Sequence, residues 1–191
     1  MTADDPIAQF SALYEQAARV LAEPDAMVLS TVDPDGRPSA RYVLLKDVDP
    51  SGFVFYTNLE SRKARALAVH PHAALTFYWP PATQVRIEGN VERVSDAEGD
   101  AYFATRPRAS QVGTWASAQS TTLTSRAALD ARVAEFERRF EGGPVARPPF
   151  WNGFRVIPSC IEYWTRDPAR LHERVVYQRD GGEWTRSLLF P

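Results

Sequence analysis

Hydrophobic residues near the start of the chain follow a helical period. Apolar side chains recur every three to four residues over residues 5–22, which predicts an amphipathic helix. Asp5 is a suitable N-cap, and Pro6 suits the first helical position. The pattern then becomes strand-like. Apolar and β-branched runs at 26–32 and 39–46 flank the turn sequence Asp33-Pro34-Asp35-Gly36, which predicts a hairpin.

Hydrophobic spacing and turn residues also predict the strands and helices in the rest of the chain. Gly- and Pro-containing turns separate short strand patterns, and three further stretches have helix-start signals or helical spacing. We expect strands over 53–57, 73–79, 84–94, 150–158, 160–165, 170–178 and 183–189, and helices over 61–70, 95–105 and 123–140. The stripe Leu129, Val133, Phe136 and Phe140 in the last helix is typical of core packing.

These elements predict a fold that is mainly β with peripheral helices (α+β). Successive hairpins favour an antiparallel barrel or rolled sheet over a doubly wound parallel sheet. We expect one domain over residues 1–191, because the chain contains no internal repeat or low-complexity segment. It also lacks the Gly-rich motifs of a dinucleotide fold or a P-loop.

Composition narrows the function classes. The net charge is -2, which disfavours a nucleic-acid-binding protein. The single cysteine, Cys160, allows no disulfide within the chain, and with only three histidines we expect no metal site. No signal peptide or membrane-spanning stretch is apparent, so we expect a cytoplasmic protein.

The basic residues are almost all arginine. Only Lys46 and Lys63 are lysine among the 22 basic residues, and arginine suits bidentate binding of phosphate. Arg41 and Lys46 lie at the two ends of an apolar strand. Arg41, Val43 and Leu45 should share one face, and Tyr42, Leu44 and Lys46 the other. The two cations either meet anions or simply reach solvent at the strand ends.

A second candidate anion site lies where residues 53–57 lead into the next helix. Tyr56 and Thr57 precede Ser61, Arg62 and Lys63 at the helix start. Cations in a first turn oppose the helix dipole, so a bound phosphate explains them well. The alternative is a capped helix with an exposed basic turn.

Two further segments carry polar groups suited to ligands. Tyr102 and Arg106 are four residues apart on a helix, and Ser110 follows one turn later if the helix continues past Pro107. This set can bind an anion or can be an exposed helix end. Gln119 and Ser120 can bond a heteroaromatic edge, or they belong to a plain loop.

The last candidate is on the strand predicted over 170–178. There Arg170, His172 and Arg174 would face the same side. Three such side chains repel one another unless negative charge lies among them. The alternative is an exposed strand face.

Taken together and in order, these segments resemble the pyridoxine (pyridoxamine) 5'-phosphate oxidase family. The resemblance runs from about residue 5 to residue 191, and its most specific stretches are RYVLLK, FYTNLESRKA, YFATRPRASQVGTWASAQS, FWNGFRV, IEYW and RLHERVVYQR. It implies an FMN-binding split β-barrel whose homodimers hold FMN in clefts at the subunit interface. Where the family usually ends in Arg-Leu-x-Pro, this chain has Leu188 in place of the arginine.

The resemblance also implies roles for individual residues. The phosphate of the substrate would contact Lys46, Tyr102, Arg106 and Ser110, while Arg170 and His172 would cover the substrate ring as catalytic residues. Gln84 and Trp164 enter through the resemblance alone. FMN would be held by Arg41, Tyr42, Val43, Leu44, Leu45, Lys46, Tyr56, Thr57, Ser61, Arg62, Lys63, Gln84, Gln119, Ser120, Trp164 and Arg174.

The implied reaction oxidises the 4' carbon of pyridoxamine or pyridoxine 5'-phosphate to pyridoxal 5'-phosphate. Dioxygen is the electron acceptor and hydrogen peroxide the second product. A phenazine-type oxidase with the same flavin residues is one alternative, although Tyr102, Arg106 and Ser110 suit a phosphate. A non-catalytic carrier of flavin or pyridoxal phosphate is the other.

Overall fold

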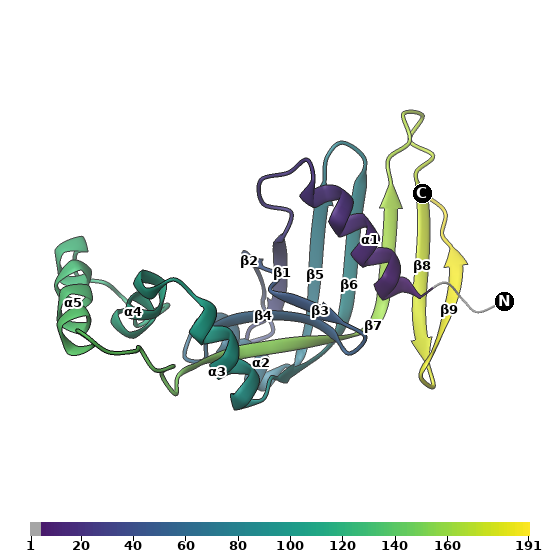
Figure 1. Cartoon of the computed structure of the whole chain (residues 1–191). Helices are drawn as coiled ribbons and strands as arrows, with labels where there is room; N and C mark the ends of the chain where they lie inside the picture. Colours follow the sequence, from purple (N-terminus) through teal and green to yellow (C-terminus); the bar gives the residue numbers. More distant parts are fainter. Residues whose placement is uncertain (1–4) are drawn as a thin grey trace.

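A computed structural model describes residues 5–191 of the chain (Figure 1). Helices and strands interleave along the sequence much as the hydrophobic pattern predicts. The helices are α1 (Pro6–Ala18), α2 (Arg62–Val69), α3 (Asp96–Thr105), α4 (Arg108–Ala116) and α5 (Arg126–Arg139). The strands are β1 (Ala26–Val32), β2 (Pro38–Leu44), β3 (Asp47–Asp49), β4 (Gly52–Asn58), β5 (His72–Trp79), β6 (Thr83–Arg93), β7 (Trp151–Thr165), β8 (Glu173–Asp180) and β9 (Glu183–Leu188).

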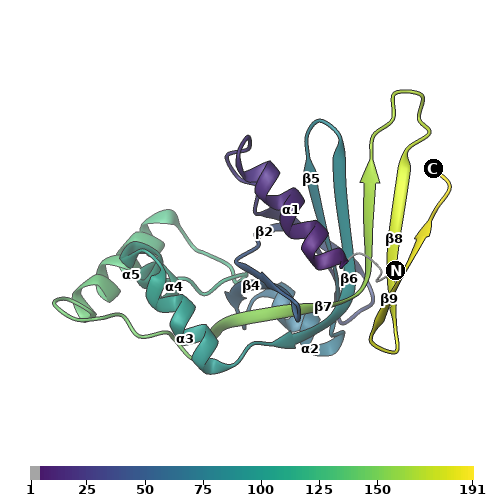
Figure 2. The ribbon, with the colours of Figure 1, turned by 45° about the vertical axis from the view of Figure 1, so that its right-hand side comes forward.

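All strands of residues 5–191 belong to one antiparallel sheet. Its order is β2-β1-β5-β6-β7-β4-β3, and β8 pairs with β7 and then with β9. The sheet curls around α1, with α3, α4 and α5 at one end of the molecule and β8 and β9 at the other (Figures 1 and 2). The prediction of a mainly β fold with peripheral helices is confirmed.

The long strand β7 organises this sheet. We predicted two strands, 150–158 and 160–165, and this was wrong, because the backbone continues as one strand. The pairing with β6 shifts register between Glu88 and Gly89, so Ser159 is an extra residue in the ladder. Pro158 and this bulge interrupt the alternation that a sequence pattern relies on. β7 pairs with β4 through its first half and with β8 through its second.

Helix α1 buries its apolar face in the curl of the sheet. The Phe10 ring is fully buried, with its centroid 4.8 Å from that of Phe53 and 5.1 Å from that of Phe77. Asp5 caps the helix as predicted, since its carboxylate accepts a hydrogen bond from the Ile7 amide. The predicted end at residue 22 was wrong, because the helix stops at Ala18 and Val20 is exposed.

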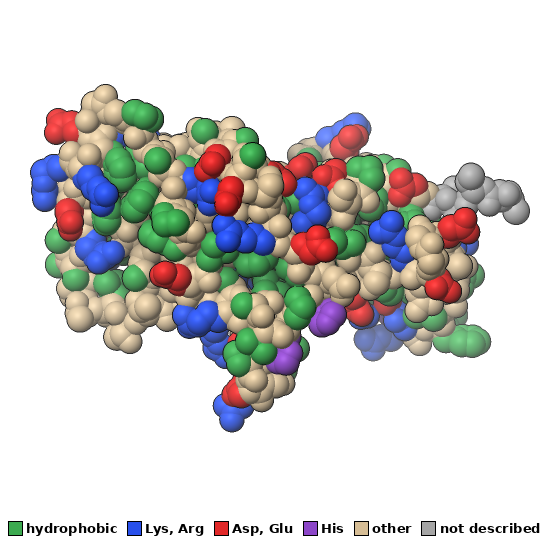
Figure 3. All heavy atoms as spheres, turned by 90° about the horizontal axis from the view of Figure 1, so that it is seen from below, with side chains coloured by type: hydrophobic (Ala, Val, Ile, Leu, Met, Phe, Trp, Pro, Cys, Tyr) green, Lys and Arg blue, Asp and Glu red, His purple; other side chains and the backbone are tan. Residues whose placement is uncertain are grey.

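The helices at the other end of the molecule pack around a smaller apolar cluster that includes Phe103, Val112 and Trp151. The prediction that the α5 stripe is core was wrong, because no α5 residue is buried. Val133, Phe136 and Phe140 are half-buried and pack against this cluster, and Leu129 is half-buried too. Hydrophobic side chains are visible between charged ones at this end of the molecule (Figure 3).

Candidate functional site

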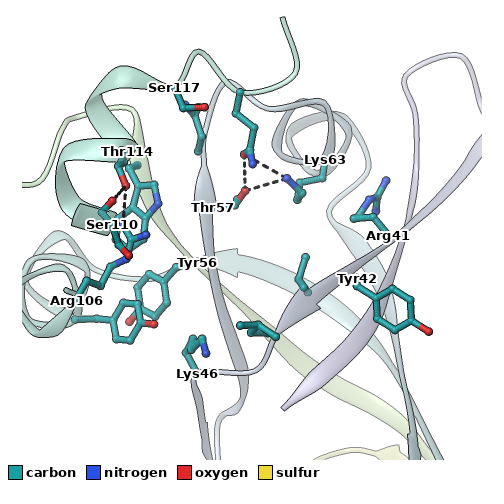
Figure 4. Close-up of a pocket in the computed structure, with 17 residues that line it drawn as sticks. Arg41, Tyr42, Lys46, Tyr56, Thr57, Lys63, Arg106, Ser110, Thr114 and Ser117 are labelled. Carbon is teal, nitrogen blue, oxygen red and sulfur yellow. Dashed lines mark hydrogen bonds between the residues drawn. The ribbon is translucent and has the colours of Figure 1, made fainter. Parts of the chain in front are cut away.

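A cavity of about 610 Å³ lies between the curled sheet and helices α3 and α4 (Figure 4). Most of the residues predicted to bind FMN or the substrate phosphate line this cavity. Its lining comprises Arg41, Tyr42, Val43, Leu44, Lys46, Tyr56, Thr57, Asn58, Lys63, Tyr102, Arg106, Ser110, Gly113, Thr114, Ser117, Gln119 and Trp151. Arg106 approaches from one side of the cavity, whereas Arg41 and Lys63 approach from the other (Figure 4).

The Lys63 side of the cavity is built at the start of α2. Ser61, which the sequence places near the helix start, is the N-cap, and its hydroxyl accepts a hydrogen bond from the Ala64 amide. This places Lys63 in the first turn, where its Nζ donates to Thr57 Oγ1 at 3.1 Å and to Gln119 Oε1 at 3.4 Å. Burial, helped by the charge of Arg41, lowers the pKa of Lys63.

Arg41 is held by neutral oxygens. Its Nη1 donates to the Leu29 carbonyl at 2.8 Å and to Thr31 Oγ1 at 3.0 Å, and its Nη2 to Ser39 Oγ. Burial lowers the pKa of Arg41, while the charge of Asp33 partly opposes that shift. These bonds fix the guanidinium at the cavity wall but do not neutralise it.

On the other side of the cavity, Arg106 ends α3. Its Nη1 donates to Thr114 Oγ1 at 2.7 Å, and Thr114 Oγ1 in turn donates to the Ser110 carbonyl. Burial lowers the pKa of Arg106, and the nearby Tyr102 partly offsets this. The sequence left open whether a helix continues past Pro107. In the structure α3 ends at Thr105 and α4 starts at Arg108, so Ser110 reaches the cavity from a second helix.

The predicted alternation along β2 is confirmed. Arg41 and Val43 are half-buried, whereas Tyr42 and Leu44 are exposed. Leu45 is buried in the core and does not line the cavity. Lys46 does line it, and its Nζ also forms an ion pair with Asp25 at 2.8 Å.

Arg62 and Ser120 lie at the edge of the cavity, outside its lining. The Arg62 guanidinium is paired with the buried carboxylate of Asp33. This hydrogen bond lowers the pKa of Asp33. The Arg62 amide donates to Ser120 Oγ at 3.2 Å, which ties the start of α2 to the segment after α4.

The remaining predicted residues form a second group on the far part of the sheet. Gln84, Trp164 and Arg174 are cross-strand neighbours on β6, β7 and β8. Arg174 Nε donates to the buried carboxylate of Glu162 at 2.7 Å, so this guanidinium is balanced by a carboxylate. Trp164 lines a separate cavity with Arg170 and His172, so one chain holds the predicted site in two parts.

The prediction that Arg170 and His172 share a strand face with Arg174 was wrong. Strand β8 begins only at Glu173, and residues before it form a turn in which Arg170 has a φ of 67°. His172 is fixed by two contacts. Its Nδ1 accepts the Asp167 amide at 3.1 Å, and its ring centroid lies 4.6 Å from that of Trp164. In the neutral imidazole the proton therefore sits on Nε2.

Sequence reasoning missed several cavity residues. Trp151 was assigned only to a strand, although it lines the cavity and lies against Arg106. Thr114 lies in α4 and Ser117 is its C-cap; this helix has no side-chain cap at its start and so gives little helix signal. Tyr78, the partner of Gln84 on β5, lines the second cavity.

The main cavity fits a ligand with two separated negative charges. Across residues 5–191, neither Lys63, Arg41 nor Arg106 forms an ion pair with a carboxylate. Charges that burial disfavours and no carboxylate balances are stabilised when an anion binds beside them. A phosphate at each side of the cavity would meet this requirement, and the Thr57, Ser110 and Gln119 side chains could add hydrogen bonds to it.

None of the helices in residues 5–191 combines the length and the hydropathy of a transmembrane segment. Within the same residues, no three His, Cys, Asp or Glu side chains are grouped so that they could hold a metal ion.

Comparison with known proteins identifies solved structures that share this fold. A split-barrel FMN-binding protein from Nostoc punctiforme, described as pyridoxamine 5'-phosphate oxidase-related, has the same fold, with a TM-score of 0.78 over all of both chains at 19% identity. PhzG from Burkholderia lata, solved with tetrahydrophenazine-1-carboxylic acid, superimposes with a TM-score of 0.92 at 34% identity over 99% of this chain and 94% of PhzG. The protein thus belongs to the class of FMN-binding split-barrel folds.

The family follows from the sequence matches. Residues 13–140 match the pyridoxamine 5'-phosphate oxidase family, and residues 151–191 match the pyridoxine 5'-phosphate oxidase C-terminal dimerisation region. The pyridoxine/pyridoxamine 5'-phosphate oxidase of Myxococcus xanthus is 58% identical over 193 residues, covering 100% of this chain and 94% of that protein. The chain belongs to the pyridoxamine 5'-phosphate oxidase family, which indicates a flavin cofactor and a homodimer.

Proposed function

We propose that the protein is an FMN-dependent oxidase that converts pyridoxamine or pyridoxine 5'-phosphate to pyridoxal 5'-phosphate, with dioxygen as acceptor and hydrogen peroxide as product. The observation that carries the proposal is that Arg41 and Lys63 on one side of the cavity, and Arg106 on the other, have no carboxylate partner among residues 5–191. A flavin mononucleotide and a phosphorylated vitamer together bring two phosphates, one for each group. Relatives at 58% identity carry the same activity in their names.

The two sides of the cavity would divide the ligands between them. Lys63, Arg41 and Thr57 would bind the FMN phosphate, with Arg62 and Ser61 supporting the helix start. Arg106, Ser110 and Lys46 would bind the phosphate of the substrate and Tyr102 would lie beside it. FMN, when bound, supplies the redox chemistry by accepting a hydride from the 4' carbon of the substrate and passing the electrons to dioxygen.

Arg170 and His172 would complete the site from a second subunit. They line a cavity separate from the one that holds Arg106, while residues 151–191 match a dimerisation region. Pairing of two chains would bring Trp164, Arg170 and His172 of one subunit over the main cavity of the other. In that position the two catalytic side chains would orient the substrate ring, and the His172 Nε2 would face it with a proton.

Backbone strain supports this assignment. Within residues 5–191, the non-glycine residues with positive φ are Ser120, at 71°, and Arg170, at 67°. Each such residue costs about 1–2 kcal/mol, so it persists only where the surrounding structure or a function requires it. Both positions belong to the predicted cofactor or substrate site.

A phenazine oxidase is the second candidate, and the similarity to PhzG favours it. The ligand in that structure carries a carboxylate, which is also an anion that Arg106 could bind. A tricyclic acid would use one cationic group in addition to that of FMN, as a phosphorylated vitamer would. The size of the substrate and the polar side chains around Ser110 therefore determine whether the tricyclic acid or the phosphorylated vitamer is the substrate.

The test is a direct comparison of substrates. The purified protein is loaded with FMN, its visible spectrum is recorded, and pyridoxamine 5'-phosphate, pyridoxine 5'-phosphate or a reduced phenazine carboxylic acid is added in air. We expect pyridoxal 5'-phosphate and peroxide in equal amounts from the first two. Oxidation of the phenazine alone would support the second candidate. A flavin spectrum without any turnover would indicate a carrier, and no flavin binding would refute both.

A further inference from the structure

Arg106 is held in the cavity by an aromatic ring. Its guanidinium carbon lies 4.7 Å from the centroid of Trp151 and 5.5 Å from that of Phe103. Its only side-chain hydrogen bond in the described chain goes to the neutral hydroxyl of Thr114. Among residues 5–191, no carboxylate lies within ion-pair distance of it.

Apart from Arg41, which neutral oxygens hold, the other partly buried arginines among the described residues are paired with carboxylates. Arg174 is paired with Glu162, Arg147 with Asp96 and Asp100, and Arg155 with Asp49 and Glu98. A carboxylate orients a guanidinium but also cancels its charge. A ring face orients the same group through its quadrupole and leaves the charge uncompensated. The contact with Trp151 thus suits an arginine that must stay available for an anion.

Trp151 is itself firmly placed. It is 6% exposed at the start of β7, and its ring stacks on that of Tyr56 with centroids 5.2 Å apart and an interplanar angle of 12°. Phe103 packs edge-on against it at 5.1 Å. Its carbonyl accepts a hydrogen bond from Arg147 at 2.7 Å. The indole cannot move far, so it offers Arg106 a rigid surface.

We infer that Trp151 is a positioning residue that selects the phosphorylated form of the substrate by holding the Arg106 guanidinium, still charged, at the cavity wall. The inference rests on the proposed function, because it assigns Arg106 to the substrate phosphate. Trp151 acts through Arg106 and needs no contact with the reacting atoms. Replacing it should weaken recognition of the phosphate and leave recognition of the rest of the substrate unchanged.

The test uses a pair of unreactive ligands, 4'-deoxypyridoxine 5'-phosphate and 4'-deoxypyridoxine, titrated into the FMN-loaded protein and followed by the flavin absorbance. In Trp151→Phe and Trp151→Leu we expect the phosphorylated ligand to bind about 3- to 30-fold more weakly, the leucine variant being the weaker. Affinity for the unphosphorylated ligand should not change. In an Arg106→Gln background, Trp151→Phe should have no further effect on either ligand.

Trp115→Phe is the matched control. Trp115 belongs to the same apolar cluster and lies under Arg139 at 5.5 Å, but it does not line the cavity. The Trp115→Phe variant should bind the phosphorylated and the unphosphorylated ligand as tightly as the unaltered protein does. Equal weakening of both ligands in Trp151→Phe, or an undiminished effect in the Arg106→Gln background, would overturn the inference and leave a purely structural role. If Trp151→Leu does not fold, the affinities of Trp151→Phe for the two ligands still test the inference. Failure of the unaltered protein to bind the phosphorylated ligand would instead refute the proposed function.

Discussion

Lys63 is a cation that the fold leaves without a carboxylate. Burial and the charge of Arg41 lower its pKa, and its Nζ bonds only to the side-chain oxygens of Thr57, Gln119 and Ser61 within the described chain. We predict that Lys63→Met weakens FMN binding by about 10- to 100-fold, because a hydrogen bond to a charged group contributes about 1.5–3 kcal/mol. Fluorescence quenching of FMN measures this. Arg65→Met, on the exposed side of the same helix, should bind FMN normally. Equal affinities in the two variants would contradict the phosphate assignment.

Tyr56 gives a prediction on pH. Burial, and to a lesser extent the charge of Glu98, raises its pKa to about 12 from an ordinary value near 10. Between these values the folded chain keeps a proton that the unfolded chain loses, so the free energy of unfolding falls as pH rises. The free energy of unfolding, measured by urea titration between pH 10 and 12, should fall less steeply with pH for Tyr56→Phe than for the unaltered protein. Tyr42→Phe, at a 77% exposed position, should behave like the unaltered protein. Identical slopes for all three would contradict the burial of Tyr56.

At this scale the sequence predicted which side chains line the cavity better than how these side chains are held. Lys63, Arg106 and Ser110 were identified from residue type and spacing, and they do meet in one cavity. Trp151 was not, because its contact with Arg106 joins residues 45 positions apart and depends on the packing of α3 against β7. No local pattern contains that information.

At the scale of elements, Gly153 on β7 fixes how closely Tyr56 approaches its neighbouring strand. A Cβ at this position would lie 2.8 Å from the Tyr56 ring and 2.9 Å from Val94. We predict that Gly153→Ala destabilises the fold by about 1–3 kcal/mol and weakens FMN binding, because the packed ring cannot shift freely. Urea denaturation and FMN titration measure the two effects. Gly143→Ala, where a Cβ meets nothing within 4 Å, is the control. A Gly153→Ala protein as stable as the control would contradict the close packing.

Element type was predictable where the hydrophobic pattern is regular, and boundaries were lost where tertiary contacts override it. The hairpin of β1 and β2 and the cap of α2 by Ser61 follow from local signals. Local signals do not predict that β7 continues through Ser159 or that β8 starts at Glu173. A bulge breaks the two-residue period, and the turn before β8 is held by the contact between His172 and the Asp167 amide.

At the scale of the whole molecule, the predicted site lies in two separate parts of the chain. The helices α3 and α4 with the main cavity lie at one end, and β8 with the second residue group at the other (Figure 1). One sheet links the two family-matched regions, which supports the proposal of a single domain. The resemblance assigns these residues to one site, but spacing along one chain could not reveal that they are divided between two cavities.

The most direct test of the account is complementation between two inactive variants. Arg106→Gln removes a residue of the main cavity, and Arg170→Ala removes one of the second group, so each alone should bind FMN yet turn over pyridoxamine 5'-phosphate slowly. When the two are co-expressed and pair at random, half of the dimers are mixed, and each mixed dimer has one intact site. We predict recovery of about a quarter of the unaltered activity at low substrate concentration. Activity no higher than that of either variant alone would show that both residues serve one site within a single chain, and would contradict the shared cleft.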